Sequence, residues 1–204
     1  MKSINYYIIY IVFLSTFMIS CSTAIPHKSM VKYYEKNKQT ILRIEGLYNR
    51  INSQKPLAAE FSDNDFNYIS LEMKTDSLRY IYEFEINEKR MCDTLLKFGY
   101  DTSSVVKLVR DMKSIKCTWI NNLSYYPDGK KQQLIYMSIR PKPLDLQLSQ
   151  KKYYILTFYK QPQYYDAEGR LLDKRNRKRL RKVNNEYFYR INDRVCYTIS
   201  TMFR

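Results

Sequence analysis

The chain has 204 residues and carries 35 Lys and Arg against 20 Asp and Glu, which gives a formal net charge of +15. That length suits one domain with its own hydrophobic core. A single histidine and four glycines argue against histidine-based catalysis, histidine-ligated metals and a glycine-rich phosphate loop. We therefore expect a basic protein that is not an enzyme and that needs no metal or other cofactor.

Residues 1–20 have the pattern of a signal peptide. Lys2 precedes an apolar, tyrosine-rich run from Tyr6 to Leu14, which continues to Ile19 with only small hydroxyl residues between. The apolar run is shorter than the roughly 20 residues that a membrane-spanning helix needs. We therefore expect residues 1–20 to direct export and to be removed.

The end of this run, Met18-Ile19-Ser20-Cys21, resembles the lipobox of bacterial lipoproteins, in which cleavage leaves a diacylglycerol-bearing cysteine as the first residue. The resemblance implies lipidation of Cys21, palmitate among the acyl groups, and a tether over residues 21–28. It also implies a place in the bacterial cell envelope, facing the periplasm and most naturally on the outer membrane. Cleavage after Ala24, which would give a secreted protein, and an uncleaved anchor are the alternatives.

Residues 29–204 form the expected single domain. Its first element is an amphipathic helix over 29–52, because apolar side chains recur there every three, four or seven residues. A strand hairpin over 66–73 and 78–86 follows. The second strand places apolar side chains at alternate positions, which is typical of a half-buried sheet.

Two short helices are predicted next. The first, over 88–98, ends before Gly99, which suits a left-handed helix cap. The second runs over 103–115, and the hydroxyl of Thr102 or Ser103 is the expected N-terminal cap.

The rest of the chain has the alternation and the turn residues of strands. Strands are predicted over 117–126, 132–140, 152–160, 186–191 and 194–203. The fold class is therefore α+β, an antiparallel sheet with helices packed on one face.

The order of helices before a curled sheet is similar to that of the nuclear-transport-factor-two family, whose sheet wraps around a pocket. The hairpin over 66–86 departs from that family. The resemblance implies a small-molecule or glycan pocket, for which a concave face lined by Tyr80, Tyr82, Phe84 and Trp119 would be the sign.

A run of seven cations in nine residues is the most unusual stretch of the chain. It consists of Lys174, Arg175, Arg177, Lys178, Arg179, Arg181 and Lys182. A solvated loop or short helix explains it without any function, because like charges this close repel one another. The functional hypothesis is attachment to anionic lipid head groups or acidic glycans. Export makes nucleic acid an unsuitable partner.

Three cysteines remain besides Cys21, so at most one internal disulfide can form and three pairings are open. Cys117 with Cys196 is the first pair to test, because both lie in predicted strands. The alternative is that Cys92, Cys117 and Cys196 are small buried apolar residues. No pair has the spacing of a zinc or thioredoxin motif.

Other short patterns are weaker. Glu83 and Glu85 point the same way from one predicted strand and are a candidate carboxylate pair for catalysis, but alternating acids on a solvated strand face are the favoured explanation. Asp76-Ser77-Leu78 and Asp93-Thr94-Leu95 resemble the sites at which some Gram-negative anaerobes attach O-glycans to exported proteins.

Two hypotheses for function follow. In the first, a membrane-anchored, non-catalytic envelope protein binds another envelope component, which could be a protein, through its sheet face and basic run. In the second, a curled sheet encloses a pocket for a small molecule or glycan.

Overall fold

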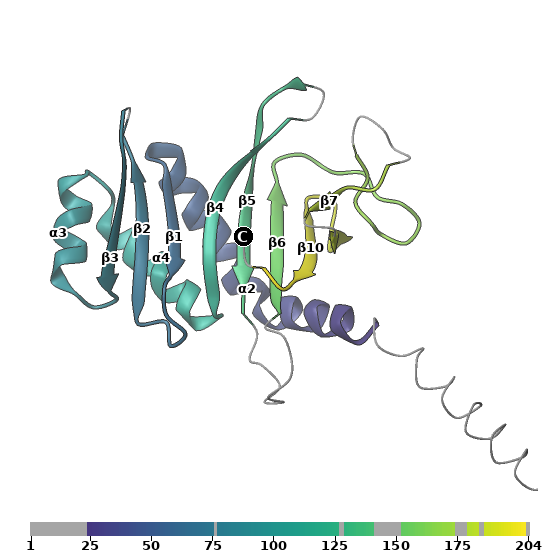
Figure 1. Ribbon diagram of the computed structural model, residues 1–204, viewed down its shortest axis with the longest axis horizontal. Coiled ribbons are helices and arrows are strands. Elements are labelled where there is room, and N and C mark those ends of the chain that lie inside the picture. The colour runs from purple at the N-terminus through teal and green to yellow at the C-terminus, as the bar shows by residue number, and fades with distance from the viewer. Residues whose placement is uncertain are drawn as a thin grey trace, which may run out of the picture. The chain divides into compact units, whose positions relative to one another are not determined.

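Figure 1 shows the computed structural model of this chain, which divides into two compact units, Met1–Lys36 and Asn37–Arg204. The boundary lies inside the first helix, after the predicted domain start at residue 29. The expected signal peptide and Cys21 lie outside the described residues. The structure describes residues 24–75, 77–126, 129–140, 152–173, 179–183 and 186–202.

The fold is α+β, as predicted, and is built on an antiparallel sheet of eight strands. The order of strands across the sheet is β3-β2-β1-β4-β5-β6-β10-β9, and β7 and β8 form a separate two-stranded ribbon. The helices are α2 (Ala24–Gln54), α3 (Lys89–Lys97) and α4 (Thr102–Ser114). The strands are β1 (Leu57–Phe61), β2 (Tyr68–Lys74), β3 (Arg79–Glu85), β4 (Cys117–Tyr125), β5 (Gln132–Ile139), β6 (Tyr153–Tyr159), β7 (Lys182–Val183), β8 (Glu186–Tyr187), β9 (Tyr189–Arg190) and β10 (Val195–Ser200).

Helix α2 is longer than the predicted helix over 29–52. In the part of α2 that belongs to the second unit, from Asn37 onward, the side chains of Ile41, Ile44 and Tyr48 are fully buried. The Tyr48 hydroxyl donates a hydrogen bond of 2.5 Å to the carbonyl oxygen of Leu57. This bond joins the helix to the first residue of β1.

Strand β1 has no counterpart among the predicted elements. Its sequence, Leu-Ala-Ala-Glu-Phe, is a short apolar run without polar alternation, and Ala has a low preference for strands. Four of its five side chains are buried, including neighbours that point to opposite faces of the sheet. A strand covered on both faces loses the alternation that identifies a half-buried one.

The predicted helix caps are partly right. Gly99 follows α3 with a φ of +68°, as expected for a left-handed cap. The N-cap of α4 is Asp101 instead of Thr102 or Ser103, and its carboxylate accepts hydrogen bonds from the Ser104 hydroxyl and the Ser103 hydroxyl at 2.6 and 2.7 Å. Bonds from these serines lower the pKa of Asp101 to about 2.

The meander of β4, β5 and β6 agrees with the predicted strands. The last predicted hairpin is more broken, since Phe188 separates β8 from β9 and turns into the core. Strand β10 pairs with β6 over its whole length and with β9 at two residues. The chain therefore leaves the sheet after β6 and returns beside the same strand.

Replacing Tyr48 by Phe tests the bond between α2 and β1. The change removes a buried hydrogen bond and leaves the Leu57 carbonyl without this donor, so we expect the free energy of unfolding to fall by about 1 kcal/mol. Urea denaturation followed by circular dichroism measures it. Tyr126→Phe, at a side chain that is 65% exposed, is the matched control, and an equal change in both variants would contradict the role given to Tyr48.

Candidate functional site: a basic hairpin anchored on the sheet

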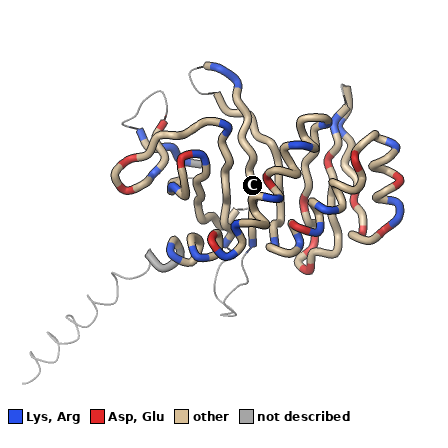
Figure 2. Tube along the Cα trace, turned by 180° about the vertical axis from the view of Figure 1, so that it is seen from behind, with Lys and Arg blue, Asp and Glu red and all other residues tan. Residues whose placement is uncertain are grey.

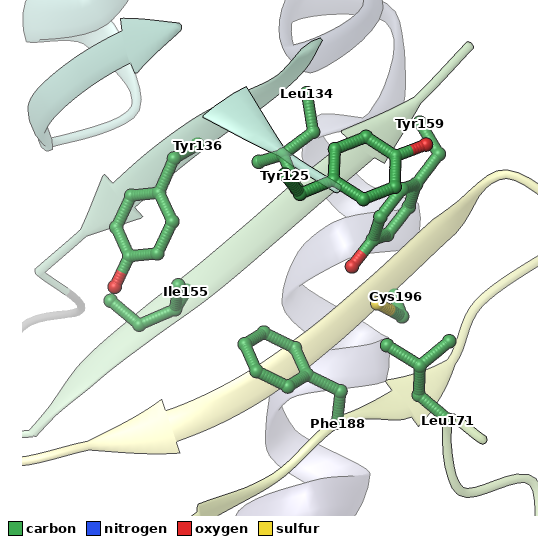
Figure 3. Close-up of a cluster of buried hydrophobic side chains, with 8 residues drawn as sticks. All are labelled: Tyr125, Leu134, Tyr136, Ile155, Tyr159, Leu171, Phe188 and Cys196. Carbon is green, nitrogen blue, oxygen red and sulfur yellow. The ribbon is translucent and has the colours of Figure 1, made fainter. Parts of the chain in front are cut away.

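Residues 160–194 form an arm that connects β6 to β10 and packs on one face of the sheet. Leu171 and Phe188 fix the arm there, since they are only 1% and 2% exposed. Figure 3 shows both side chains among a buried cluster. The members from the sheet are Tyr125, Leu134, Tyr136, Ile155, Tyr159 and Cys196.

The arm contains a short hairpin around the predicted basic run. Leu172 bridges Leu180, the Asp173 amide donates to the Arg179 carbonyl at 2.8 Å, and the Arg181 amide donates to the Leu171 carbonyl at 2.9 Å. Residues 171–173 therefore run antiparallel to residues 179–181. We call residues 171–182 the basic hairpin.

Four of the seven predicted cations, Lys174, Arg175, Arg177 and Lys178, lie outside the described residues. The chain segment that contains them starts and ends at the paired residues Asp173 and Arg179. The pairing therefore holds Asp173 and Arg179, the residues that flank this segment, close together on the arm.

The described cations of the hairpin have different surroundings. The Arg181 guanidinium lies over two tyrosine rings of the cluster, 5.3 Å from the centroid of Tyr125 and 5.8 Å from that of Tyr159. Such contacts stabilise by about 0.5–2 kcal/mol, depending on burial. Lys182 lies 4.5 Å from the Tyr187 ring centroid, and Arg179 is exposed. Arg181 is thus an anchor of the hairpin.

Two other cations of the arm are engaged within it. Arg170 pairs with Asp166 at 2.7 Å and with Glu168 at 3.1 Å. Arg190 pairs with Asp193 at 2.6 Å. By contrast, Asp173 is the only acidic residue between positions 171 and 182. Positive charge in the arm is therefore concentrated in the basic hairpin.

The possible disulfide between Cys117 and Cys196 does not form in this structure. Cys92, Cys117 and Cys196 are all free thiols. Cys117 lies on β4 and Cys196 on β10, with β5 and β6 between them. Three strand spacings amount to roughly 14 Å, whereas a disulfide needs Cα atoms within about 7 Å. Both thiols are buried, and burial raises the pKa of Cys196 to about 12.

The aromatic pocket expected from Tyr80, Tyr82, Phe84 and Trp119 does not form. The rings of Tyr80 and Tyr82 lie 5.1 and 5.8 Å from Phe98, and Phe84 is 1% exposed. The strand register places Trp119 on the opposite face. There its ring packs 5.2 Å from Tyr136, next to the buried cluster.

Other predicted residues lie on ordinary surfaces. Glu83 and Glu85 are exposed on β3, and Glu83 accepts a hydrogen bond from the Ser62 hydroxyl at 2.7 Å. His27 lies within α2. Asp76 is outside the described residues, while Asp93 is exposed on α3.

The described part of the chain holds no group of three or more His, Cys, Asp and Glu side chains that could bind a metal ion. Within the same residues, none of the helices combines the length and the apolar character that crossing a membrane requires.

A polar cleft near this site was not predicted from the sequence. This cleft of about 630 Å³ opens where β4 leaves β1, and it is lined by the end of α2 and by strand ends of the sheet. Burial raises the pKa of Glu45 on its helical wall, and the charge of Arg194 opposes that shift. Its lining residues are spread from position 45 to position 194, so no local motif indicates it.

Comparison with known protein families, with characterised proteins and with solved structures gives no match for this chain.

Arg181→Gln tests the anchoring of the hairpin. Losing the guanidinium over Tyr125 and Tyr159 should lower the free energy of unfolding by about 1 kcal/mol. Arg179→Gln removes the same charge from an exposed neighbour and should leave stability unchanged. Thermal and urea unfolding of the two variants give the comparison, and equal stabilities would rule out Arg181 as an anchor.

Proposed function

We propose that this chain is a lipid-anchored, non-catalytic envelope protein that binds an anionic membrane surface through its basic hairpin. The observation that carries the proposal is the antiparallel pairing of residues 171–173 with residues 179–181. It places Asp173 and Arg179, which flank a five-residue segment with four cations in the sequence, side by side on an arm packed against the sheet. Positive charge concentrated on an arm that is packed against the sheet is suited to a membrane surface with many anionic head groups.

Electrostatics supports a lipid surface as the partner. The hairpin carries seven cations and one carboxylate, a net charge of +6. Each basic group close to an anionic lipid surface contributes about 1 kcal/mol at moderate salt. Because this attraction is screened beyond a Debye length of about 8 Å at physiological salt, only cations that approach the surface together contribute in this way.

The proposed location at a membrane also supports anionic lipid as the partner. Acylation of Cys21 after export would place the chain at a membrane, where anionic lipid head groups are the nearest abundant anions. A lipid anchor and a polybasic segment commonly act together as two membrane signals. Acidic glycans and an acidic face of an envelope protein share this chemistry and are the competing partners.

Lipid anchoring at Cys21 is tested by measuring the mass of the N-terminal peptide from membrane-extracted protein. We expect a peptide that begins at Cys21 and carries acyl groups, because the Met18–Cys21 segment directs lipidation and cleavage there. Cys21→Ala should abolish it, whereas Cys92→Ala should not. A soluble protein that begins at Ile25, or a chain that keeps Met1, would contradict lipid anchoring.

The partner is tested with the chain that lacks residues 1–21, so that no acyl group contributes. It should bind phosphatidylcholine vesicles only when they contain phosphatidylglycerol, and added salt should release it. Replacing Lys174, Arg175, Arg177 and Lys178 by Gln removes four contributions of about 1 kcal/mol. At about 1.4 kcal/mol per tenfold, affinity should fall by about a thousandfold. Cosedimentation measures this.

The matched control replaces four exposed cations of α3 and α4, Lys89, Lys97, Lys107 and Arg110, by Gln. It changes net charge by the same amount and should retain most of the binding. Equal losses in both variants would indicate attraction by net charge alone. Tighter binding to soluble alginate than to anionic vesicles would replace lipid by acidic glycan as the partner.

A further inference from the structure

The sheet opens between β1 and β4. Strand β1 pairs with β2 at all five of its residues, but with β4 only at Ala59 with Ile120 and at Glu60 with Trp119. Beyond Ile120, β4 continues with β5 as far as Tyr125. Figure 1 shows β4 and β5 extending past β1 on this side. The polar cleft lies at this opening.

Amide side chains dominate one part of the cleft wall. Asn49 and Asn52 come from α2, Asn122 from β4 and Gln133 from β5, whereas Asn121 lines the cleft from the other face of β4. Each amide offers both a donor and an acceptor. Such a wall suits a ligand with many hydroxyl groups, which also donate and accept.

The amides of β4 and β5 do not satisfy one another fully. The Asn122 side chain donates to the Gln133 side-chain oxygen at 3.1 Å, and the Asn122 backbone donates to the Asn121 side-chain oxygen at 2.7 Å. The Asn122 side-chain oxygen is buried and accepts no hydrogen bond from any described residue. Asn49 and Gln133, by contrast, are exposed, so their amide groups can be reached by a ligand in the cleft.

Three cations occupy another part of the wall, at neighbouring strand ends. Lys131 precedes β5, Lys160 follows β6 and Arg194 precedes β10. These strands are adjacent in the sheet, and neighbouring strands lie about 4.8 Å apart. Figure 2 shows Lys and Arg at the projecting end of the β4–β5 hairpin. The cations therefore form one basic side of the cleft.

The acidic residues of the cleft do not neutralise this basic side. Glu72 pairs with Lys74 at 3.5 Å and with Arg79 at 3.2 Å. Glu45 interacts electrostatically with Arg194. Lys131 and Lys160 are exposed and form no ion pair with any described residue. An anionic group on a ligand would supply the missing partner.

We infer that this cleft binds an acidic sugar, with hydroxyl groups on the amide wall and a carboxylate or phosphate on Lys131 and Lys160. The volume of about 630 Å³ lies within the range of about 300–1,000 Å³ for small-molecule sites. Buried Phe158 contributes apolar surface to the cleft, on which the carbon skeleton of a sugar would lie. The inference is independent of membrane binding by the basic hairpin.

The test uses the purified mature protein and four probes, which are trigalacturonate, the neutral trisaccharide maltotriose, glucose 6-phosphate and inorganic phosphate. Isothermal titration calorimetry measures affinity, and backbone NMR shifts map the site. We expect trigalacturonate or glucose 6-phosphate to bind more tightly than maltotriose and phosphate. The shifts should lie at Asn121, Asn122 and the ends of β5 and β6.

Variants separate the two walls of the cleft. Lys131→Gln combined with Lys160→Gln should lower the affinity for the acidic probes by about tenfold or more. A tenfold change corresponds to about 1.4 kcal/mol. The pair Lys89→Gln with Lys97→Gln removes the same charge from α3 and should have no effect. Asn49→Ala, at an exposed position, should lower the affinity for every sugar probe and leave the affinity for inorganic phosphate unchanged.

Several results would overturn the inference. Equal affinity for maltotriose and trigalacturonate would remove the acidic requirement, and equal affinity for phosphate and both acidic probes would remove the sugar. Absence of binding, or shifts confined to the basic hairpin, would reject the cleft as the site. Since the substituted lysines and Asn49 are exposed, unchanged unfolding temperatures will show that each variant is folded.

Discussion

The unequal pairing of β4 with its two neighbours determines most of this structure. Strand β4 holds β5 at eight residue pairs but β1 at only two, so the sheet behaves as two parts joined near Ile120. On one side, β2 and β3 carry exposed or half-buried side chains at alternate positions. On the other, the arm covers one face of β5, β6 and β10 through Leu171 and Phe188. The cleft lies at this division.

Elements with a strong local pattern could be predicted from the sequence. The alternation over β3, the apolar periodicity of α2 and the cap at Gly99 each depend only on residues close together in the sequence. Strand β1 could not be predicted in this way, because burial on both faces removes alternation from Leu-Ala-Ala-Glu-Phe. The cap of α4 was misassigned by one or two residues, since Asp101, Thr102 and Ser103 are all good capping residues.

The sites could be predicted only where their residues are contiguous. The seven cations of the basic hairpin are visible as a run, whereas their anchoring through Arg181 to Tyr125 and Tyr159 depends on contacts between distant strands. The sequence could not choose among the cysteine pairings for the same reason, because strand membership alone does not reveal that two strands separate β4 from β10. The cleft depends on side chains from α2 and five strands, and no sequence spacing connects them.

Tyrosine explains how so basic a chain can pack its cations against a sheet. Arg170, Arg181, Lys182 and Arg190 each lie within 6 Å of a tyrosine ring centroid, where the negative face of the ring favours a cation and the stem of the side chain stays on apolar surface. Among the described contacts, Arg181 and Lys182 are held in this way without an ion pair, whereas Arg170 and Arg190 also pair with acids. Lys131 and Lys160 have neither such a ring nor an acid in the described contacts. These two exposed lysines are the groups that we propose for the acidic group of a sugar.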